Sequence, residues 1–220
     1  MLYCGFGSAA LRDGAAVAAA CIAGGAAAGC RVLLAGGLGG GLPLPHGAAC
    51  NGVEGDDVDP CRADVFWMCD APHDWLLPRC VAALHHGGSG TCHAALRAGT
   101  PQLVCPLEFD QHFWAGRMRA LGVAPPPLAI DALTADNVAA ALRRALSEPI
   151  CSRAAAMKDE LAREEDGAEV AAAFITAYVP AARDKLRRQH AAAAAAQPCG
   201  AERGVETSAR TRAVAAAGGR

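Results

Sequence analysis

Residues Val81 to Cys105 read VAALHHGGSGTCHAALRAGTPQLVC. Val81 to His85 is a short apolar run typical of a buried strand, the glycines after it indicate a turn, and Thr91 to Ala98 is typical of a helix. Gly99 then suits the C-cap of that helix, and a second apolar strand follows over Gln102 to Cys105. Strand, turn, helix and strand in this order predict a parallel βαβ unit.

The same alternation continues on both sides of this unit. Upstream, apolar runs alternate with Ala-rich helical stretches, and downstream Thr134 begins an amphipathic run with Asp136 and Asn137 in its first turn, as in an N-capped helix. We expect strands over 2–6, 31–35 and 65–69, and helices over 15–28, 111–121, 134–146, 153–163 and 168–178. The sequence therefore predicts an α/β fold with a doubly wound parallel sheet.

The length bounds the domain organisation. A chain of 220 residues suffices for one doubly wound domain and is too short for two. We expect one domain over 1–179, with a Gly- and Pro-rich surface loop over 36–60. The remainder, 180–220, is charged and then rich in alanine, and its composition predicts a low-complexity tail without regular structure.

Composition excludes several classes of protein. A formal net charge of -2 gives no general attraction to nucleic acid or anionic membranes. The 11 cysteines are scattered and form no CxxC pair, so we expect reduced, mostly buried thiols. No signal peptide is visible at the start of the sequence, and the stretch from Ala15 to Ala35 is mostly Ala and Gly and contains Arg31, which disfavours a membrane span. We expect a cytoplasmic location, with at most peripheral membrane contact.

The turn His85-His86-Gly87-Gly88-Ser89-Gly90-Thr91 is the first candidate site. Glycines let the backbone approach a ligand, and the N-H groups and dipole of a helix start favour an anion such as a diphosphate. His86 and Thr91 add donors. The alternative, that two histidines and a flexible loop merely end a strand, carries about equal weight from the turn alone.

The pair Asp110-Gln111 follows the next predicted strand, at the same carboxyl edge of the sheet. A carboxylate and a carboxamide together accept from and donate to adjacent hydroxyl groups, which is what holding a hexose requires. The alternative for Asp110 is a helix N-cap.

Three longer stretches resemble the donor-binding signature of sterol 3-beta-glucosyltransferases, which are family-1 nucleotide-sugar glycosyltransferases of the GT-B fold. They are PHDWLLPR (72–79), HHGGSGT (85–91) and LRAGTPQLVCPLEFDQHFWAGRMRALGVAP (96–125). GFGS (5–8) resembles the first turn of the same domain and REEDG (163–167) its late helical segment. The resemblance extends from Leu2 to Tyr178 and implies a Rossmann-like C-terminal domain that binds UDP-glucose.

The resemblance also implies residue roles. His86 would stabilise the leaving diphosphate, without a metal ion or any other cofactor, and His73 would lie beside the nucleoside. Trp75 would border the uracil pocket, although a core position before two leucines is favoured about two to one. The implied donor-binding set is Gly7, Ser8, His73, Trp75, His86, Gly88, Ser89, Gly90, Thr91, Asp110 and Gln111, with Asp110 and Gln111 at the glucose hydroxyls.

Three positions depart from the family pattern. Cys92 stands where a second threonine is common, and Phe109 stands where the sterol enzymes have a small residue, so a bulky ring is expected to narrow the sugar site. Ala94 occupies the position of a ribose-binding glutamate in many relatives, although sterol enzymes often lack that acid too.

Competing motifs are incomplete. Gly5-x-Gly7-x-x-Ala10 imitates a dinucleotide fingerprint, but no acid follows the second strand. The Gly-x-Ser-x-Gly pattern of a hydrolase fails because Thr91 stands at its last position. Asp57-Val58-Asp59 could bind a metal, yet a solvated loop is the favoured interpretation, and no zinc spacing occurs.

The resemblance implies inverting transfer of glucose to a sterol or similar lipid hydroxyl. In that family an N-terminal domain, which would precede Leu2, carries the general base and the acceptor site. We expect both to be missing here and the isolated chain to be inactive. The alternative is a stand-alone donor-binding subunit, or a non-catalytic module, that needs a separate acceptor-binding chain.

Overall fold

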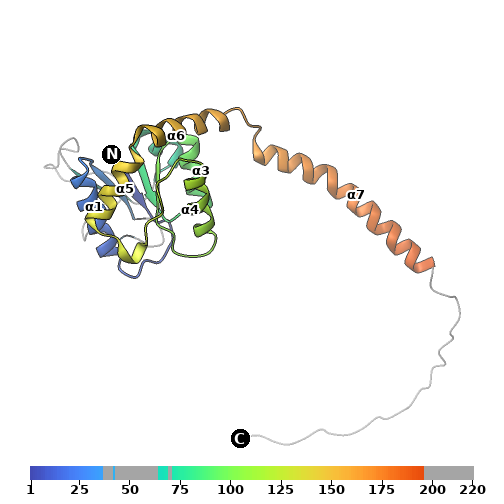
Figure 1. Ribbon diagram of the computed structural model, residues 1–220. Coiled ribbons are helices and arrows are strands. Elements are labelled where there is room, and N and C mark those ends of the chain that lie inside the picture. Colours follow the sequence, from blue (N-terminus) through green and yellow to red (C-terminus); the bar gives the residue numbers. More distant parts are fainter. Residues whose placement is uncertain (37–41, 43–63, 69–70, 196–220) are drawn as a thin grey trace, which may run out of the picture. The chain divides into compact units, whose positions relative to one another are not determined.

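Five short parallel strands form the sheet of the first structural unit, in the order β3-β2-β1-β4-β5. Figure 1 shows this sheet with helices packed around it. The computed structural model describes residues 1–36, 42, 64–68 and 71–195. They divide into two units, Met1–Glu164 and Glu165–Arg220. The strands are β1 (Leu2–Gly5), β2 (Val32–Ala35), β3 (Val65–Met68), β4 (Ala82–His85) and β5 (Gln102–Val104).

The strand order places a topological switch point between β1 and β4. From β1 the chain moves outward to β2 and β3, and it then returns to the other side of β1 to form β4 and β5. Gly5 at the end of β1 is in register with His85 at the end of β4. The turns that follow these two strands therefore emerge side by side, at the place where open α/β sheets bind ligands.

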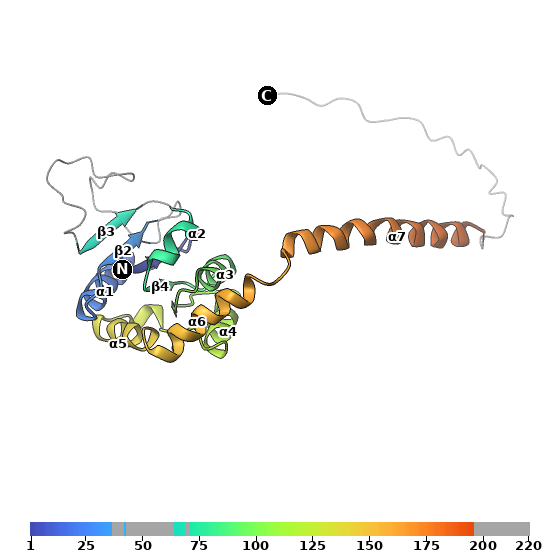
Figure 2. The same ribbon diagram turned by 90° about the horizontal axis from the view of Figure 1, so that it is seen from above.

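Helices cover both faces of the sheet, as Figure 2 shows. Helices α1 (Gly14–Ala27) and α5 (Ala135–Ala145) pack on one face, where Gly24 approaches Val138 closely enough that a Cβ would meet its side chain at 2.6 Å. The short α2 (His73–Leu76), η1 (Leu77–Arg79) and α3 (Ser89–Ala98) lie on the other face. Helices α4 (Gln111–Ala120) and α6 (Glu148–Leu161) pack against α3 through a separate apolar cluster.

The expected doubly wound α/β fold is confirmed, and the strands lie within one residue of their predicted ends. Burial on both faces explains why the strands read as apolar runs without alternation. Thr134 caps α5 as predicted, because its Oγ1 accepts from the Asn137 amide at 3.2 Å and its own amide donates to Asn137 Oδ1 at 2.9 Å. The seven cysteines of the described segments are free thiols, also as expected.

Three helices are longer than the sequence predicts, and α3 begins at Ser89 rather than at Thr91. Helix α6 begins at Glu148 rather than at residue 153, with Pro149 in its first turn, where proline fits a helix. In the second unit, α7 (Gly167–Ala195) continues through Pro180, so residues 180–195 are helical where a tail without regular structure is expected. Alanine, leucine, lysine and arginine dominate that stretch, and their helix propensity offsets the one hydrogen bond that Pro180 removes.

The predicted domain boundary and the predicted surface loop differ in how far the described residues cover them. The first unit ends at Glu164, so the expected boundary at residue 180 falls inside α7. The predicted surface loop over 36–60 falls almost wholly outside the described residues, apart from Gly36 and the buried Leu42. None of the helices in the described ranges combines the length and apolar character needed to cross a bilayer.

Candidate functional site

The turns after β1 and β4 meet around the ring of His86. Gly7 has a φ of 57°, and a Cβ built on it would stand 3.2 Å from His86 Cε1. On the other side, a Cβ on Gly88 would stand 2.5 Å from His86 Nε2. The two glycines thus leave room for the imidazole, in addition to the close ligand approach that the sequence suggests.

His86 combines partial burial with an unsatisfied nitrogen. Its Nδ1 is buried and makes no hydrogen bond within the part of the chain that the structure describes. Burial lowers the pKa of His86, although the Gly5 backbone and the Asp110 carboxylate act in the opposite direction. The lowered pKa favours the neutral imidazole at pH 7, and within the described residues one of its nitrogens lacks a hydrogen-bond partner.

The start of α3 is open to an anion. Gly88 is the N-cap residue and provides no side-chain cap, so the first-turn amides depend on other partners. Ser89 is exposed, and a Cβ on Gly90 would meet nothing within 4 Å. Thr91 is partly exposed in the same turn. Amides, hydroxyls and helix dipole together form the kind of surface that binds phosphate.

The pair Asp110-Gln111 lies directly beside this turn. Gly87, with a φ of 89°, packs so closely that a Cβ on it would stand 2.8 Å from Val104 Cγ1 and 3.2 Å from the Gln111 carbonyl oxygen. The charge of Asp110 also acts on both His86 and Cys92. The fold therefore brings together the two elements that were predicted as phosphate and hexose sites.

Within the pair, the Gln111 side chain is already engaged. It is 7% exposed, and its Oε1 accepts from the Leu107 amide at 2.8 Å and the Glu108 amide at 3.1 Å. These bonds hold the loop between β5 and α4 in place. Only the amide nitrogen of Gln111 remains to donate to a hydroxyl group.

Asp110 occupies the N-cap position of α4, as the alternative interpretation predicts, but its side chain does not cap the helix. It makes no capping hydrogen bond, and its Oδ2 instead accepts from the indole N-H of Trp114 at 2.8 Å. Trp114 packs edge-on against His93 with ring centroids 4.9 Å apart, and His93 Nδ1 donates to the Ser89 carbonyl at 2.7 Å. Sequence reasoning missed this link between α3 and α4, whose only signal is the spacing of four residues in each pair.

His73 and Trp75, the two residues predicted near the nucleoside, lie in different environments. His73 Nε2 is 3.1 Å from the Tyr3 hydroxyl, and His73 lines a cavity of about 520 Å³ together with Ala94 and Arg97. Trp75 is 55% exposed, and the Arg79 guanidinium lies 4.5 Å from its ring centroid. The core position favoured for Trp75 is therefore wrong, because α2 turns this residue away from the buried Leu76 and Leu77.

The departures at Cys92 and Phe109 have structural consequences. Cys92 is fully buried, and burial, followed by the Asp110 charge, raises the pKa of its thiol to about 12, so it is an inert packing residue. Phe109 is 84% exposed and has a φ of 53°, the left-handed region that disfavours bulky side chains.

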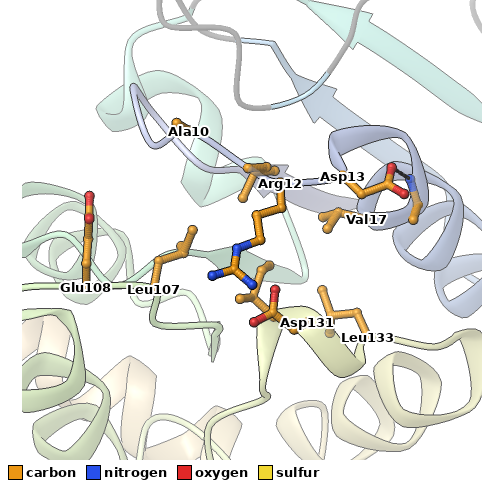
Figure 3. Close-up of a pocket in the computed structure, with 11 residues that line it drawn as sticks. Ala10, Arg12, Asp13, Val17, Leu107, Glu108, Asp131 and Leu133 are labelled. Carbon is orange, nitrogen blue, oxygen red and sulfur yellow. Dashed lines mark hydrogen bonds between the residues drawn. The ribbon is translucent and has the colours of Figure 1, made fainter.

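A pocket of about 400 Å³ lies between the loops that follow β1 and β5 (Figure 3). Arg12 extends into it from one side, and Glu108 and Asp131 contribute carboxylates. None of the predicted donor-binding residues lines it, so this pocket adjoins the predicted site without overlapping it. No sequence motif joins these residues, because they come from three segments far apart in the chain.

Metal ligands form no cluster in the described segments, where no three His, Cys, Asp or Glu side chains are placed to hold an ion. Asp57 and Asp59, the acidic pair weighed as a metal site, lie outside the described residues. Metal independence stays a prediction.

The chain is similar in sequence to curated glycosyltransferases. A sterol 3-beta-glucosyltransferase of Arabidopsis thaliana is 34% identical over 122 residues, which is 56% of this chain and 19% of that protein. The O-mycaminosyltylonolide 6-deoxyallosyltransferase of Streptomyces fradiae is 37% identical over 112 residues, 51% of this chain and 26% of that protein. The chain thus spans about a quarter or less of the length of these relatives.

The fold has solved counterparts among glycosyltransferases. The crystal structure of the glycosyltransferase SnogD from Streptomyces nogalater matches 80% of this chain and 41% of its own, with a TM-score of 0.54 and 26% identity. This match confirms the expected Rossmann-like fold of a glycosyltransferase C-terminal domain. A family model described as "Erythromycin biosynthesis protein CIII-like, C-terminal domain" matches residues 56–177. Since that match covers more than half of the chain, the protein belongs to the erythromycin biosynthesis protein CIII-like C-terminal domain family.

Proposed function

We propose that this chain binds the donor of a sugar transfer, UDP-glucose, and stabilises the UDP leaving group while glucose passes to a sterol or similar lipid hydroxyl. The observation that carries the proposal is the meeting of two turns at the switch point, with Asp110 beside them. The Arabidopsis relative, a sterol 3-beta-glucosyltransferase, supports the choice of sugar and acceptor.

The diphosphate is assigned to the start of α3. The first-turn amides of 89–91 and the ring of His86 would surround it, with Ser8 approaching from the turn after β1. In the part of the chain that the structure describes, His86 has a buried nitrogen without a hydrogen-bond partner, and its lowered pKa favours the neutral ring. A bound diphosphate favours the protonated ring, so binding and proton uptake are coupled.

The chemical contribution of these groups is electrostatic. As the acceptor oxygen attacks the anomeric carbon from the face opposite the diphosphate, the carbon-oxygen bond to UDP breaks and negative charge grows on the leaving group. Preorganised donors stabilise that charge, and one such donor contributes about 3 kcal/mol in well-studied cases. Within this set, His86 is the donor that also holds an ionisable proton.

The hexose is assigned to Asp110 and the amide nitrogen of Gln111. The Trp114 indole fixes one oxygen of the Asp110 carboxylate and leaves the other to accept from a hydroxyl. His73, in the cavity with Ala94, is assigned to the nucleoside. The general base and the acceptor site are assigned to a partner domain or chain, and the cytoplasmic location stays a prediction.

Calorimetry of the purified chain with UDP and UDP-glucose tests the proposal, and His86→Ala is the decisive variant. We expect wild-type protein to bind both ligands and His86→Ala to bind UDP about tenfold or more weakly. Equal affinity of the two proteins for UDP would remove the phosphate assignment. Formation of a sterol glucoside by the chain alone would contradict the assignment of the general base to a partner.

A further inference from the structure

His85, the residue before His86, has both ring nitrogens engaged inside the protein. It ends β4 and is 0% exposed. The Gly87 amide donates to its Nδ1 at 3.1 Å, and its Nε2 lies 3.0 Å from Gln102 Oε1. Because an amide can only donate, Nδ1 is the acceptor, so Nε2 carries the proton and donates to Gln102.

The chain of hydrogen bonds continues from Gln102 into α3. The Gln102 side-chain nitrogen donates to the Cys92 carbonyl at 3.3 Å. The ring of His85 is thus the central member of a buried path from the Gly87 amide, through β5, to the first turns of α3. Both ring nitrogens of His85 and both polar atoms of the Gln102 side chain have a partner on this path, which fixes the orientation of the two side chains.

The ring remains uncharged over the physiological pH range. Burial, and then repulsion from the protonated form of His86, lower the pKa of His85 to about 3, against the opposing effect of the Gln102 hydrogen bond. A neutral ring with no free nitrogen has nothing to offer a diphosphate. The two adjacent histidines therefore have separate tasks.

We propose that His85, held by Gln102, is a positioning residue of the nucleotide-sugar site: it fixes the Gly87 amide and thereby aims His86 and the start of α3 at the diphosphate. The inference rests on the proposed function for the identity of the ligand. Gly87 is the residue where this control matters most, because its φ of 89° lies in the region that glycine enters most readily, and a Cβ there would stand 2.8 Å from Val104 Cγ1.

Two variants separate the parts of the path. Gln102→Leu keeps the approximate volume but removes both hydrogen bonds of the side chain. His85→Asn keeps an oxygen that accepts from the amide two residues on, as in an Asx turn, and loses the contact with Gln102. Thr100→Val is the matched control, since it removes another buried hydrogen bond of the same region, to the Leu77 carbonyl, without touching the turn.

The readouts are UDP affinity by calorimetry, hydrogen exchange of the Gly87 amide, and the ¹⁵N shifts of the His85 ring. We expect Gln102→Leu to bind UDP about tenfold more weakly, because the loss of both buried hydrogen bonds leaves the His85 ring without its support, with faster exchange at Gly87. His85→Asn should retain most of the Gly87 protection. Thr100→Val should lose thermal stability while its UDP affinity stays that of the wild type.

Several results would overturn the inference. These are a protonated Nδ1 on His85, unchanged UDP affinity and Gly87 exchange in Gln102→Leu, or an equal loss of affinity in Thr100→Val. If wild-type protein binds no UDP, the proposed function fails. The ring shifts and the Gly87 exchange then still decide whether the pair holds the turn.

Discussion

The carboxylate of Asp110 accepts a hydrogen bond from the indole of Trp114 at 2.8 Å, one turn further along α4. This bond orients an exposed acid that would otherwise rotate freely, and it links the acid through Trp114 to His93 on α3. A carboxylate held in this way is prepared to accept from a sugar hydroxyl without first losing its own mobility.

Removal of the indole donor should therefore affect the sugar more than the nucleotide. Trp114→Phe keeps the aromatic packing against His93 and Phe113 and loses only the hydrogen bond. We expect UDP-glucose to bind about three- to tenfold more weakly, with UDP affinity unchanged, since one charge-assisted hydrogen bond is lost. Calorimetry with both ligands measures the difference, and Asp110→Ala should show the same selectivity more strongly.

The contact between Gly7 and His86 gives a second prediction. Gly7→Ala forces a side chain into a left-handed backbone, at a cost of about 1 to 2 kcal/mol, and places its Cβ 3.2 Å from the imidazole. Gly29→Ala is a matched control, because Gly29 has a φ of 71° and open space around it. Urea unfolding should show a similar loss in both variants, whereas only Gly7→Ala should weaken UDP binding. Equal UDP affinity in both variants would mean that the turn after β1 does not contribute to UDP binding.

The depressed pKa of His85 predicts a loss of stability in acid. A histidine with a pKa of about 6.5 in the unfolded chain and about 3 in the folded one binds its proton only after unfolding across that interval. The unfolded state then holds more protons, so the free energy of unfolding falls as pH decreases, by up to about 1.4 kcal/mol per pH unit below pH 6. His85→Asn should remove most of this slope, which chemical denaturation from pH 7 to pH 4 can measure. If His85→Asn keeps the wild-type slope of unfolding free energy against pH, that slope arises from other titratable groups.

The strands and the turn around His86 were predictable from short sequence patterns. Apolar runs marked every strand, and the glycines around His86 marked the turn, because steric and solvation effects act within a few residues. The Thr134 cap was predictable for the same reason. The order of the strands then brought Gly7, His86 and Asp110 together, as the carboxyl edge of a parallel sheet requires.

Side-chain partners across the fold were not predictable from those patterns. Gln111 was expected to face a sugar, but its oxygen accepts from two amides of its own loop, and such a bond depends on how that loop folds back. The buried path from His85 to Gln102 joins residues 17 positions apart. Helix α7 continues through Pro180 because the helix propensity of its many other residues outweighs the effect of one proline. The position of a single proline therefore does not predict where this helix ends.

Phe109 has a φ of 53°, in the left-handed region, and the residue is 84% exposed. A bulky residue in the left-handed region costs about 1 to 2 kcal/mol, and little packing offsets that strain here. Phe109→Gly should raise the free energy of unfolding by about 1 kcal/mol, after the greater flexibility of glycine in the unfolded chain is deducted. Phe109→Ala removes the ring but keeps the strain, so it should bring no such gain. Urea denaturation of the three proteins measures the effect, and an equal gain from alanine would mean that the exposed ring, not the backbone, is unfavourable.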